Sequence, residues 1–207
     1  LSDLQTMLRG TLRNKGFCSA WDILVQLGCC EDTYEMEGVQ TMTHRSFIDS
    51  FLPDNSGPSA EEKIRSVFGL AANGTEIKNL KWSGLFTEEL VGLSKGTPAQ
   101  ILEHILNKKW KLSPEDKDQI VMWHRFVYEQ EQKTKEIQAS LVATGTDSVY
   151  TAMAKTVGLP LAISAKLVLE GKIKTRGVVV PTGKEIYDPV LAELKRSGIE
   201  LHETHFE

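Results

Sequence analysis

The first regular pattern of apolar residues predicts a helix near the start of the chain. Over residues 19–27, apolar side chains recur at the spacing of one helix face, and Gly28 ends the pattern. Residues 6–12 alternate weakly and run into a polar turn with glycine, which is typical of a strand followed by a loop. Strand, loop and helix make half of a βαβ unit, and open α/β sheets bind ligands in such loops. The apolar helix positions are Ala20, Ile23, Leu24 and Leu27.

The pattern changes over residues 34–110, where short helical stretches alternate with loops such as residues 53–58 and no strand pattern is convincing. The clearest helix begins at Gly96-Thr97-Pro98, with Thr97 as N-cap and Pro98 at the first helical position. We expect residues 34–116 to form a helical insertion in an α/β domain that starts with residues 1–33. The apolar face of the clearest helix comprises Ile101, Leu102, Ile105 and Leu106.

Residues 117–146 predict two strands that return the chain to the sheet as an antiparallel hairpin. Residues 119–128 carry apolar side chains on both faces, which is typical of a strand covered on both faces. Residues 134–144 alternate again after a polar linker. We interpret His124, within the first strand, as a buried core histidine rather than a catalytic one, because no cysteine or carboxylate at a fixed local spacing accompanies it.

Residues 147–207 predict C-terminal helices and strands that dock on another domain. The turn at residues 144–147 is interpreted as a routine helix N-cap, with an anion site at the helix N-terminus as the alternative. The terminal strands suggest docking onto a sheet whose other strands this chain lacks. The expected helices cover residues 148–157, 161–169 and 188–197, and the expected strands cover residues 178–180 and 199–202.

Composition narrows the class of protein. With 207 residues and 41% hydrophobic residues, the chain can bury a core as a globular protein of one or two domains. A formal charge of −4 and a pI near 5.8 argue against a general binder of nucleic acid. No apolar run approaches the roughly 20 residues of a membrane-spanning helix, so we expect no membrane span.

The cysteines and the N-terminus bear on the compartment. The adjacent pair Cys29 and Cys30 lacks the spacer of metal or redox motifs, and with Cys18 the number is odd, which favours a reducing intracellular compartment and no metal site. We interpret Cys18 as a small inert hydrophobe. Residues 1–3 contain neither an initiator methionine nor a visible targeting signal, so we expect a cut end there.

A cluster of positive charge precedes the first helix. Arg9, Arg13 and Lys15 lie in the stretch RGTLRNKGF, together with Gly10 and Gly16. Charged loops are common on protein surfaces, so a solvated turn is one interpretation. A receptor for a ligand rich in carboxylates is the other.

Several stretches together resemble the saccharopine dehydrogenase family, in particular the dehydrogenase half of the bifunctional enzyme of lysine breakdown in animals. They follow the family's order along nearly all of the chain, and their joint occurrence is specific. The carrying stretches are Arg9-Gly10-Thr11-Leu12-Arg13, Gly16-Phe17, Gly96-Thr97-Pro98-Ala99, Ile120-Val121-Met122-Trp123-His124-Arg125-Phe126, Gly158-Leu159-Pro160, Gly171-Lys172-Ile173, Pro181 and Glu185-Ile186-Tyr187-Asp188-Pro189.

The resemblance implies a fold, and it implies that substrate and cofactor bind to different domains of the parent chain. The fold class is α/β: part of a substrate domain with a helical insertion, and C-terminal segments that pack on a Rossmann domain of the same parent chain. The resemblance implies that NAD or NADP binds to that Rossmann domain. No glycine fingerprint of the form G-x-G-x-x-G occurs in this chain, so we expect no cofactor here and no activity of this chain alone.

The resemblance also implies a substrate and a site. Thr11, Leu12 and Arg13 match the family's substrate-contacting loop, and saccharopine brings three carboxylates that suit an arginine fork. In the fungal enzymes of the family an aromatic residue often follows this arginine, and here Asn14 stands there. The implied reaction is oxidative cleavage of saccharopine to L-glutamate and α-aminoadipic semialdehyde. The proton-transfer residues would lie upstream, so no catalytic residue is assigned.

The remaining implications concern the cell and the alternatives. Resemblance to the animal enzyme implies a mitochondrial location, and a cytoplasmic one is expected otherwise; the oligomeric state stays open. One alternative function is a related NAD(P)-dependent oxidoreductase acting on another amino-acid adduct. The other is a helical interaction module without enzymatic activity, in which residues 9–15 are only a solvated turn.

Overall fold

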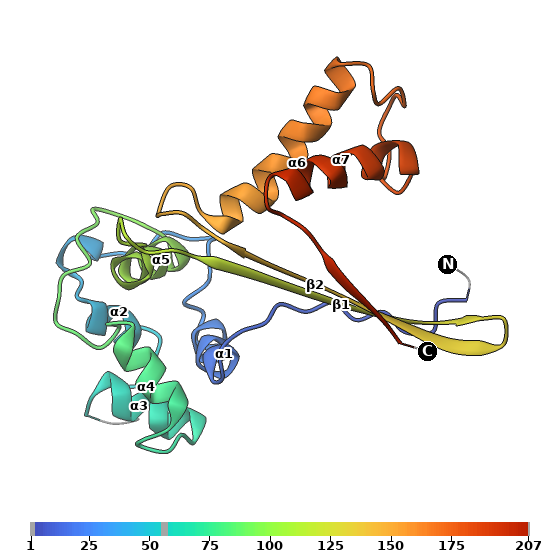
Figure 1. Cartoon of the computed structure of the whole chain (residues 1–207). Helices are drawn as coiled ribbons and strands as arrows, with labels where there is room; N and C mark the ends of the chain where they lie inside the picture. The colour runs from blue at the N-terminus through green and yellow to red at the C-terminus, as the bar shows by residue number, and fades with distance from the viewer. Residues whose placement is uncertain (1–2, 55–57, 207) are drawn as a thin grey trace. The chain divides into compact units, whose positions relative to one another are not determined.

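The computed structural model describes residues 3–54 and 58–206 and divides the chain into two compact units, Leu1–Lys111 and Leu112–Glu207. Helices make up the regular structure of the first unit, and an antiparallel sheet with two helices makes up the second (Figure 1). The chain as a whole therefore has the expected α/β composition.

The first unit is a cluster of short helices. An isolated bridge between Thr43 and Leu90 is the β-type pairing that the structure records among its described residues. The elements are α1 (Phe17–Leu27), the 3-10 helix η1 (Val39–Thr41), α2 (His44–Asp49), α3 (Ala60–Phe68), α4 (Thr75–Trp82) and α5 (Pro98–Trp110).

Two helices predicted from the sequence are confirmed, with capping chemistry that explains their ends. Gly28 adopts the left-handed conformation, with φ 88°, and its N–H group bonds to the carbonyl oxygens of Leu24 and Val25, which ends α1. Thr97 and Gln100 form a reciprocal capping box at the start of α5, with Pro98 following the cap. The buried residues of α5 are those predicted, so its apolar face points into the core.

The core of the first unit contains side chains from α1 and from each of the other helices of that unit. It buries aliphatic side chains and one phenylalanine, Phe47, which meets Phe51 edge to face. The buried members are Ala20, Ile23, Leu24, Cys29, Val39, Phe47, Ile48, Leu52, Ala60, Ile64, Ile77, Leu80, Leu85, Val91, Ile101, Leu102, Ile105 and Leu106.

The prediction of a strand over residues 6–12 is wrong. The structure has irregular, exposed chain there, and the side chain of Leu12 is 80% exposed. A strand needs a partner to satisfy its backbone groups, and no described sheet pairing involves these residues. The half βαβ unit inferred from the pattern is therefore not formed by this chain.

The second unit contains the predicted hairpin. Strands β1 (Gln119–Gln130) and β2 (Lys133–Thr144) pair antiparallel in continuous register, from Gln119 with Thr144 to Gln130 with Lys133. The turn residues Glu131 and Gln132 both have positive φ, 55° and 60°, as a two-residue hairpin turn of type I′ requires. The sequence predicts the hairpin but not this two-residue turn, because the usual Asn-Gly or Asp-Gly pair is absent.

The sequence predicts that other layers cover both faces of β1, but the structure leaves both faces largely open. Side chains on both of its faces are largely exposed, including Trp123, Phe126 and Val127. His124 is half-buried and its ring stacks on that of Phe126, so it is not a core histidine of this chain. The layers that an apolar pattern on both faces requires are not supplied by the described residues.

The C-terminal helices differ from the predicted ranges near two prolines. A single helix α6 (Ala152–Leu169) replaces the two expected, with Pro160 inside it, and α7 (Lys184–Arg196) begins before Pro189. A proline lacks the backbone N–H group and usually kinks or ends a helix, but α6 continues through Pro160. In α6 the hydroxyl of Ser164 donates to the carbonyl of Pro160 at 2.6 Å, within the same turn.

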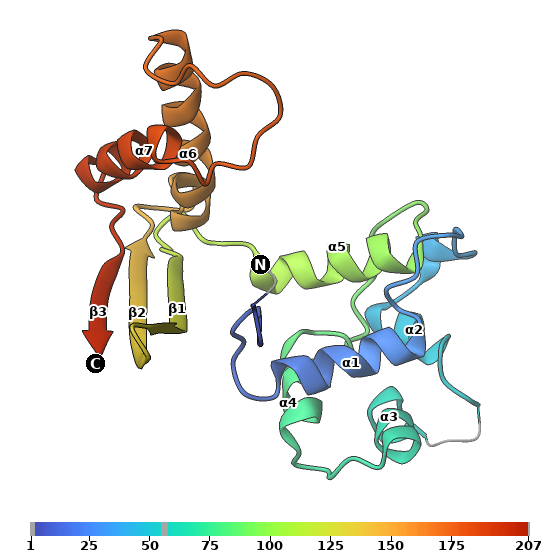
Figure 2. The same cartoon turned by 90° about the vertical axis from the view of Figure 1, so that its right-hand side faces the viewer.

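The terminal strands also differ from the prediction. Residues 178–180 are exposed loop, and the last strand is β3 (His202–Phe206) rather than residues 199–202. It pairs antiparallel with β2, giving the order β1-β2-β3, so its partner lies within this chain and not outside it. Figure 2 shows β3 beside β2, with α6 and α7 beyond one end of the sheet.

The helices of the second unit share a small core. Leu167, Ile173 and Ile186 are buried there, with Ile163 and Val190 packed against them. By length and composition alone, the 18-residue helix α6 could cross a membrane. One such helix is weak evidence, because core helices of soluble proteins share these properties, and the absence of a membrane span stays a prediction.

Candidate functional site

The three predicted site residues lie in the exposed chain that leads into α1. Thr11, Leu12 and Arg13 are all exposed and belong to no helix or strand. The Arg13 guanidinium donates through Nη1 to the carbonyl oxygen of Leu12 at 2.9 Å. This bond takes one of the five guanidinium donors, so the fork retains donors for a carboxylate.

A tight corner connects this segment to α1. Gly16 has φ 80°, a left-handed backbone conformation that residues other than glycine rarely adopt. The N–H group of Phe17 bonds to the carbonyl of Asn14 at 3.0 Å. From α4, the side chain of Asn79 donates to the carbonyl of Gly16 at 3.2 Å. The corner fixes where α1 begins and therefore where Phe17 points.

Three aromatic rings lie together next to Arg13, and we call them the aromatic shelf: Phe17, Trp21 and Trp110. The rings of Phe17 and Trp21 lie nearly parallel, at 4° and 6.1 Å between centroids. The Trp110 ring, from α5, lies 5.9 Å from Trp21 and 6.4 Å from Phe17. The Cζ atom of Arg13 sits over the Phe17 ring, 5.5 Å from its centroid, within the range of a cation–π contact.

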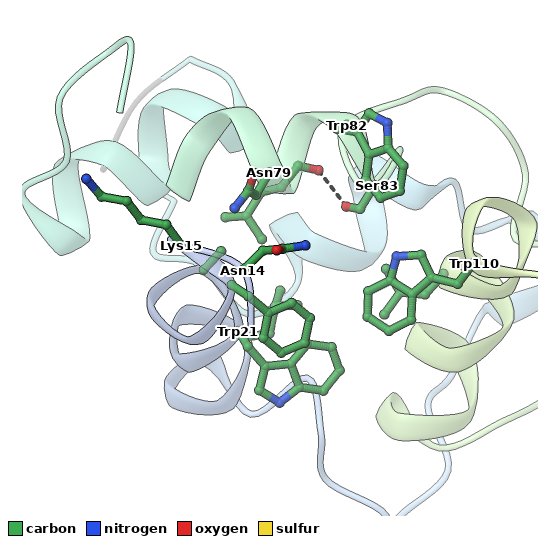
Figure 3. A pocket seen from close by; sticks show the side chains of 12 residues that line it. Asn14, Lys15, Trp21, Asn79, Trp82, Ser83 and Trp110 are labelled. Carbon is green, nitrogen blue, oxygen red and sulfur yellow. Dashed lines mark hydrogen bonds between the residues drawn. The ribbon is translucent and has the colours of Figure 1, made fainter. Parts of the chain in front are cut away.

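A cavity of about 250 Å³ lies beside the shelf. Figure 3 shows the indoles of Trp21 and Trp110 at this cavity, with Trp82 and Ser83 across it, while the Lys15 side chain extends away from the tryptophans. The Ser83 hydroxyl is satisfied by the carbonyl of Leu80, at 2.6 Å. The lining residues are Asn14, Lys15, Phe17, Ala20, Trp21, Leu24, Asn79, Leu80, Trp82, Ser83, Leu106 and Trp110.

Sequence reasoning missed the shelf. Phe17 and Trp21 are four residues apart on one helix, a spacing that brings side chains together and could have indicated the pair. Trp110 is distant in sequence, and its approach depends on how α5 packs against α1. The sequence shows the positive charge of residues 9–15 directly, but it does not show the aromatic surface beneath Arg13.

The alternative anion site near residues 144–147 is already filled by the chain's own carboxylates. Asp118 accepts hydrogen bonds from the N–H groups of Ala152 and Met153 at the start of α6, at 2.5 and 2.9 Å. Asp147 accepts from Val149 and Tyr150. These bonds lower the pKa of both carboxyl groups, so each is an anion at neutral pH and occupies the position that a ligand would take.

The described part of the chain offers no metal site, and of its three cysteines Cys29 is buried whereas Cys18 and Cys30 are exposed. No group of three or more His, Cys, Asp or Glu side chains there is arranged to hold a metal ion. Burial raises the pKa of the Cys29 thiol to about 12, so it is protonated at neutral pH and inert. Burial also raises the pKa of Cys30.

The fold and the exposed Arg13 segment define a mixed α/β protein with a carboxylate-binding candidate but no assigned catalytic group. Comparison with known proteins gives the family. Residues 1–199 match the family model described as Saccharopine dehydrogenase C-terminal domain. The chain belongs to the saccharopine dehydrogenase family, and it corresponds to the C-terminal portion of those enzymes.

Individual relatives agree with this assignment. The mitochondrial alpha-aminoadipic semialdehyde synthase of Rattus norvegicus is 34% identical over 204 residues, covering 96% of this chain and 22% of the relative. The L-glutamate-forming, NADP(+) saccharopine dehydrogenase of Saccharomyces cerevisiae is 31% identical over 211 residues, covering 98% of this chain and 47% of the relative.

A solved structure of the yeast enzyme, apo saccharopine dehydrogenase, matches this fold with a TM-score of 0.74 and 28% identity. The match covers 96% of this chain and 46% of that structure. The chain thus spans about half the length of the fungal relatives and about a fifth of the animal ones.

Proposed function

We propose that this chain is the substrate-binding portion of a longer saccharopine dehydrogenase that acts in lysine degradation. The observation that carries the proposal is the family match over residues 1–199, which includes the segment with Thr11, Leu12 and Arg13. The reaction is the oxidative cleavage of saccharopine to L-glutamate and α-aminoadipic semialdehyde. The names of the rat and yeast relatives support this reaction class.

Arg13 binds a substrate carboxylate in this proposal. A guanidinium meets a carboxylate with two parallel hydrogen bonds, and saccharopine carries three carboxylates. Thr11 adds a hydroxyl group and a backbone amide, and Leu12 adds main-chain contact. By holding the substrate, these residues place its secondary amine and the adjacent carbon for reaction, which is the contribution that positioning makes to catalysis.

When bound to the Rossmann domain of the parent, NAD or NADP would supply the hydride acceptor. This chain has no glycine fingerprint to hold the pyrophosphate of the cofactor. Loss of hydride from the lysine-derived carbon beside the secondary amine leaves an imine of the substrate. Water adds to that imine, and the resulting carbinolamine separates into the semialdehyde and L-glutamate, which leaves as the amine. For release of L-glutamate and the semialdehyde, the carbon that is oxidised must be the one on the lysine-derived side.

The exposed apolar residues of the second unit are where we propose that the rest of the parent packs. They lie on both faces of β1 and on α6, and they include Trp123, Phe126 and Leu161. A surface of this kind usually marks an interface. The mitochondrial names of the animal relatives favour a mitochondrial location for the parent.

The test uses the full-length enzyme with saccharopine and either NAD⁺ or NADP⁺, following both reduced nicotinamide and L-glutamate. Arg13→Ala should lower kcat/KM for saccharopine by about 30- to 1000-fold, because a carboxylate loses its charged donor. Turnover of a different amino-acid adduct in place of saccharopine would assign the chain to a related oxidoreductase. A loss below about threefold for Arg13→Ala would show that residues 9–15 are a solvated turn.

A further inference from the structure

Arg13 has a long side chain on an exposed segment, so something must limit its range if it is to meet a substrate carboxylate in one geometry. An arginine loses rotamer freedom on binding, and a site that orders it beforehand reduces this loss. The structure gives its guanidinium two contacts, the Leu12 carbonyl and the Phe17 ring. The first is local to the same segment, whereas the second reaches a different element.

We propose that Phe17 is a positioning residue for substrate binding, holding the Arg13 guanidinium through a cation–π contact backed by Trp21 and Trp110. This inference rests on the proposed function of Arg13 and deepens it. The ring has no hydrogen-bond acceptor, so the contact leaves the N–H groups of Arg13 to a carboxylate. Phe17 itself touches no reacting atom in this proposal.

The ring of Phe17 is held rigidly enough to act as a support. Its backbone follows the corner at Gly16, which Asn79 fixes from α4. Its ring stacks on Trp21 of the same helix and lies 6.4 Å from Trp110 of α5. Because α1, α4 and α5 all contribute, the position of Arg13 is coupled to the folded core of the first unit rather than left to the exposed segment.

The test compares two substitutions in the full-length enzyme. Phe17→Leu keeps an apolar side chain but removes the ring, and it should raise KM for saccharopine by about two- to fivefold, the range of an exposed cation–π contact, with kcat within about twofold. Phe17→Tyr keeps a ring and should restore KM to within about 1.5-fold of the parent. KM for the nicotinamide should not change in either variant.

A matched control and a double variant separate positioning from a structural role. Phe68→Leu makes the same change at a partly buried ring packed on the same core, away from the described contacts of Arg13, and should leave KM for saccharopine unchanged. In an Arg13→Ala background, Phe17→Leu should have no further effect on KM. A similar effect of Phe17→Leu with and without Arg13 would overturn the inference, as would no effect in the parent. If Arg13→Ala alone leaves kcat/KM unchanged, Arg13 does not bind the substrate as proposed. The inference about Phe17, which rests on that role, is then wrong as well.

Discussion

The Asp118 carboxylate accepts a hydrogen bond from the backbone N–H of Met153 at 2.9 Å, linking residues 35 positions apart. Asp118 lies just before β1, and Met153 lies in the first turn of α6. The carbonyl of Asp118 also accepts from the N–H group of Gly145, just after β2, at 2.8 Å. One residue therefore ties the open end of the hairpin to the helix that follows it.

We expect Asp118→Ala to lower the thermal midpoint of the second unit by a few degrees, because two N–H groups at a helix start lose their acceptor. Bonds from Met153 and Ala152 lower the pKa of Asp118 in the folded state. Its contribution is therefore complete above the unfolded-state pKa of about 3.9 and is lost as the pH falls through the lower folded-state pKa. Thermal unfolding at pH 7 and near pH 2 measures this: the two proteins should differ at pH 7 and converge in acid. An unchanged difference at both pH values would contradict it.

Gly16→Ala should destabilise the first unit by more than the cost of the left-handed backbone alone, which is about 1–2 kcal/mol. A Cβ atom at Gly16 would overlap the methyl group of Thr75, in addition to the strain of φ 80°. Gly38→Ala is the matched control, because Gly38 has φ 69° and open space around it. Denaturant unfolding should give Gly16→Ala a lower free energy of unfolding than Gly38→Ala. Equal losses of unfolding free energy in the two variants would argue against the contact with Thr75.

His44 should make the stability of the first unit depend on pH. Its side chain is buried, its Nδ1 lies 3.1 Å from the Gly84 carbonyl, and its Nε2 lies 3.3 Å from the Lys108 ammonium group. These partners fix the neutral ring, with Nδ1–H donating and Nε2 accepting. Burial first, and then the charge of Lys108, lowers the pKa of His44 in spite of the Gly84 bond and of nearby Glu89; His104 adds to the lowering.

Since the folded-state pKa of His44 is below the unfolded value of about 6.5, its contribution is complete above that pH and declines as the pH falls toward the folded-state pKa. Unfolding free energies measured between pH 7.5 and 5 should therefore decrease for the parent chain. His44→Gln removes the titrating group and should give a shallower slope, whatever its own loss of stability. Parallel slopes for the two proteins would rule His44 out as the source.

Arg13→Lys should recover only part of the activity that Arg13→Ala loses in the full-length enzyme. An ammonium group keeps the charge but cannot make two parallel bonds to one carboxylate, and it stacks less well on Phe17. Lys15→Ala, in the same charged segment but outside the Thr11–Arg13 triplet, should stay within about twofold of the parent in kcat/KM. Steady-state kinetics with saccharopine decides between these outcomes, and full recovery by lysine would mean that charge alone matters.

Local signals in the sequence predicted α1, α5 and the hairpin, because each depends on chemistry within a few residues. Gly28 and the Thr97 capping box mark helix ends through their own backbone bonds. The alternation of residues 134–144 identifies β2. Family membership, predicted from motifs spread along the chain, is confirmed by the comparisons.

Most of the features that were missed depend on distant partners. Residues 6–12 have strand-like composition but no paired strand. Pro160 is a local exception, because α6 continues through it. The aromatic shelf requires Trp110 to approach α1 from α5, which no local pattern encodes. The roles of Thr11, Leu12 and Arg13 remain predictions, because they concern a substrate whose binding geometry depends on the rest of the parent.

The exposed β1 strand also has a consequence for how this chain behaves when handled apart from its parent. It forms an edge of the three-stranded sheet, and its side chains are apolar on both faces. An edge of this kind is a template on which strands of other molecules can add. Isolated copies should therefore associate with one another as their concentration rises, even while each remains folded, and charged substitutions at Val121 or Val127 should suppress this aggregation.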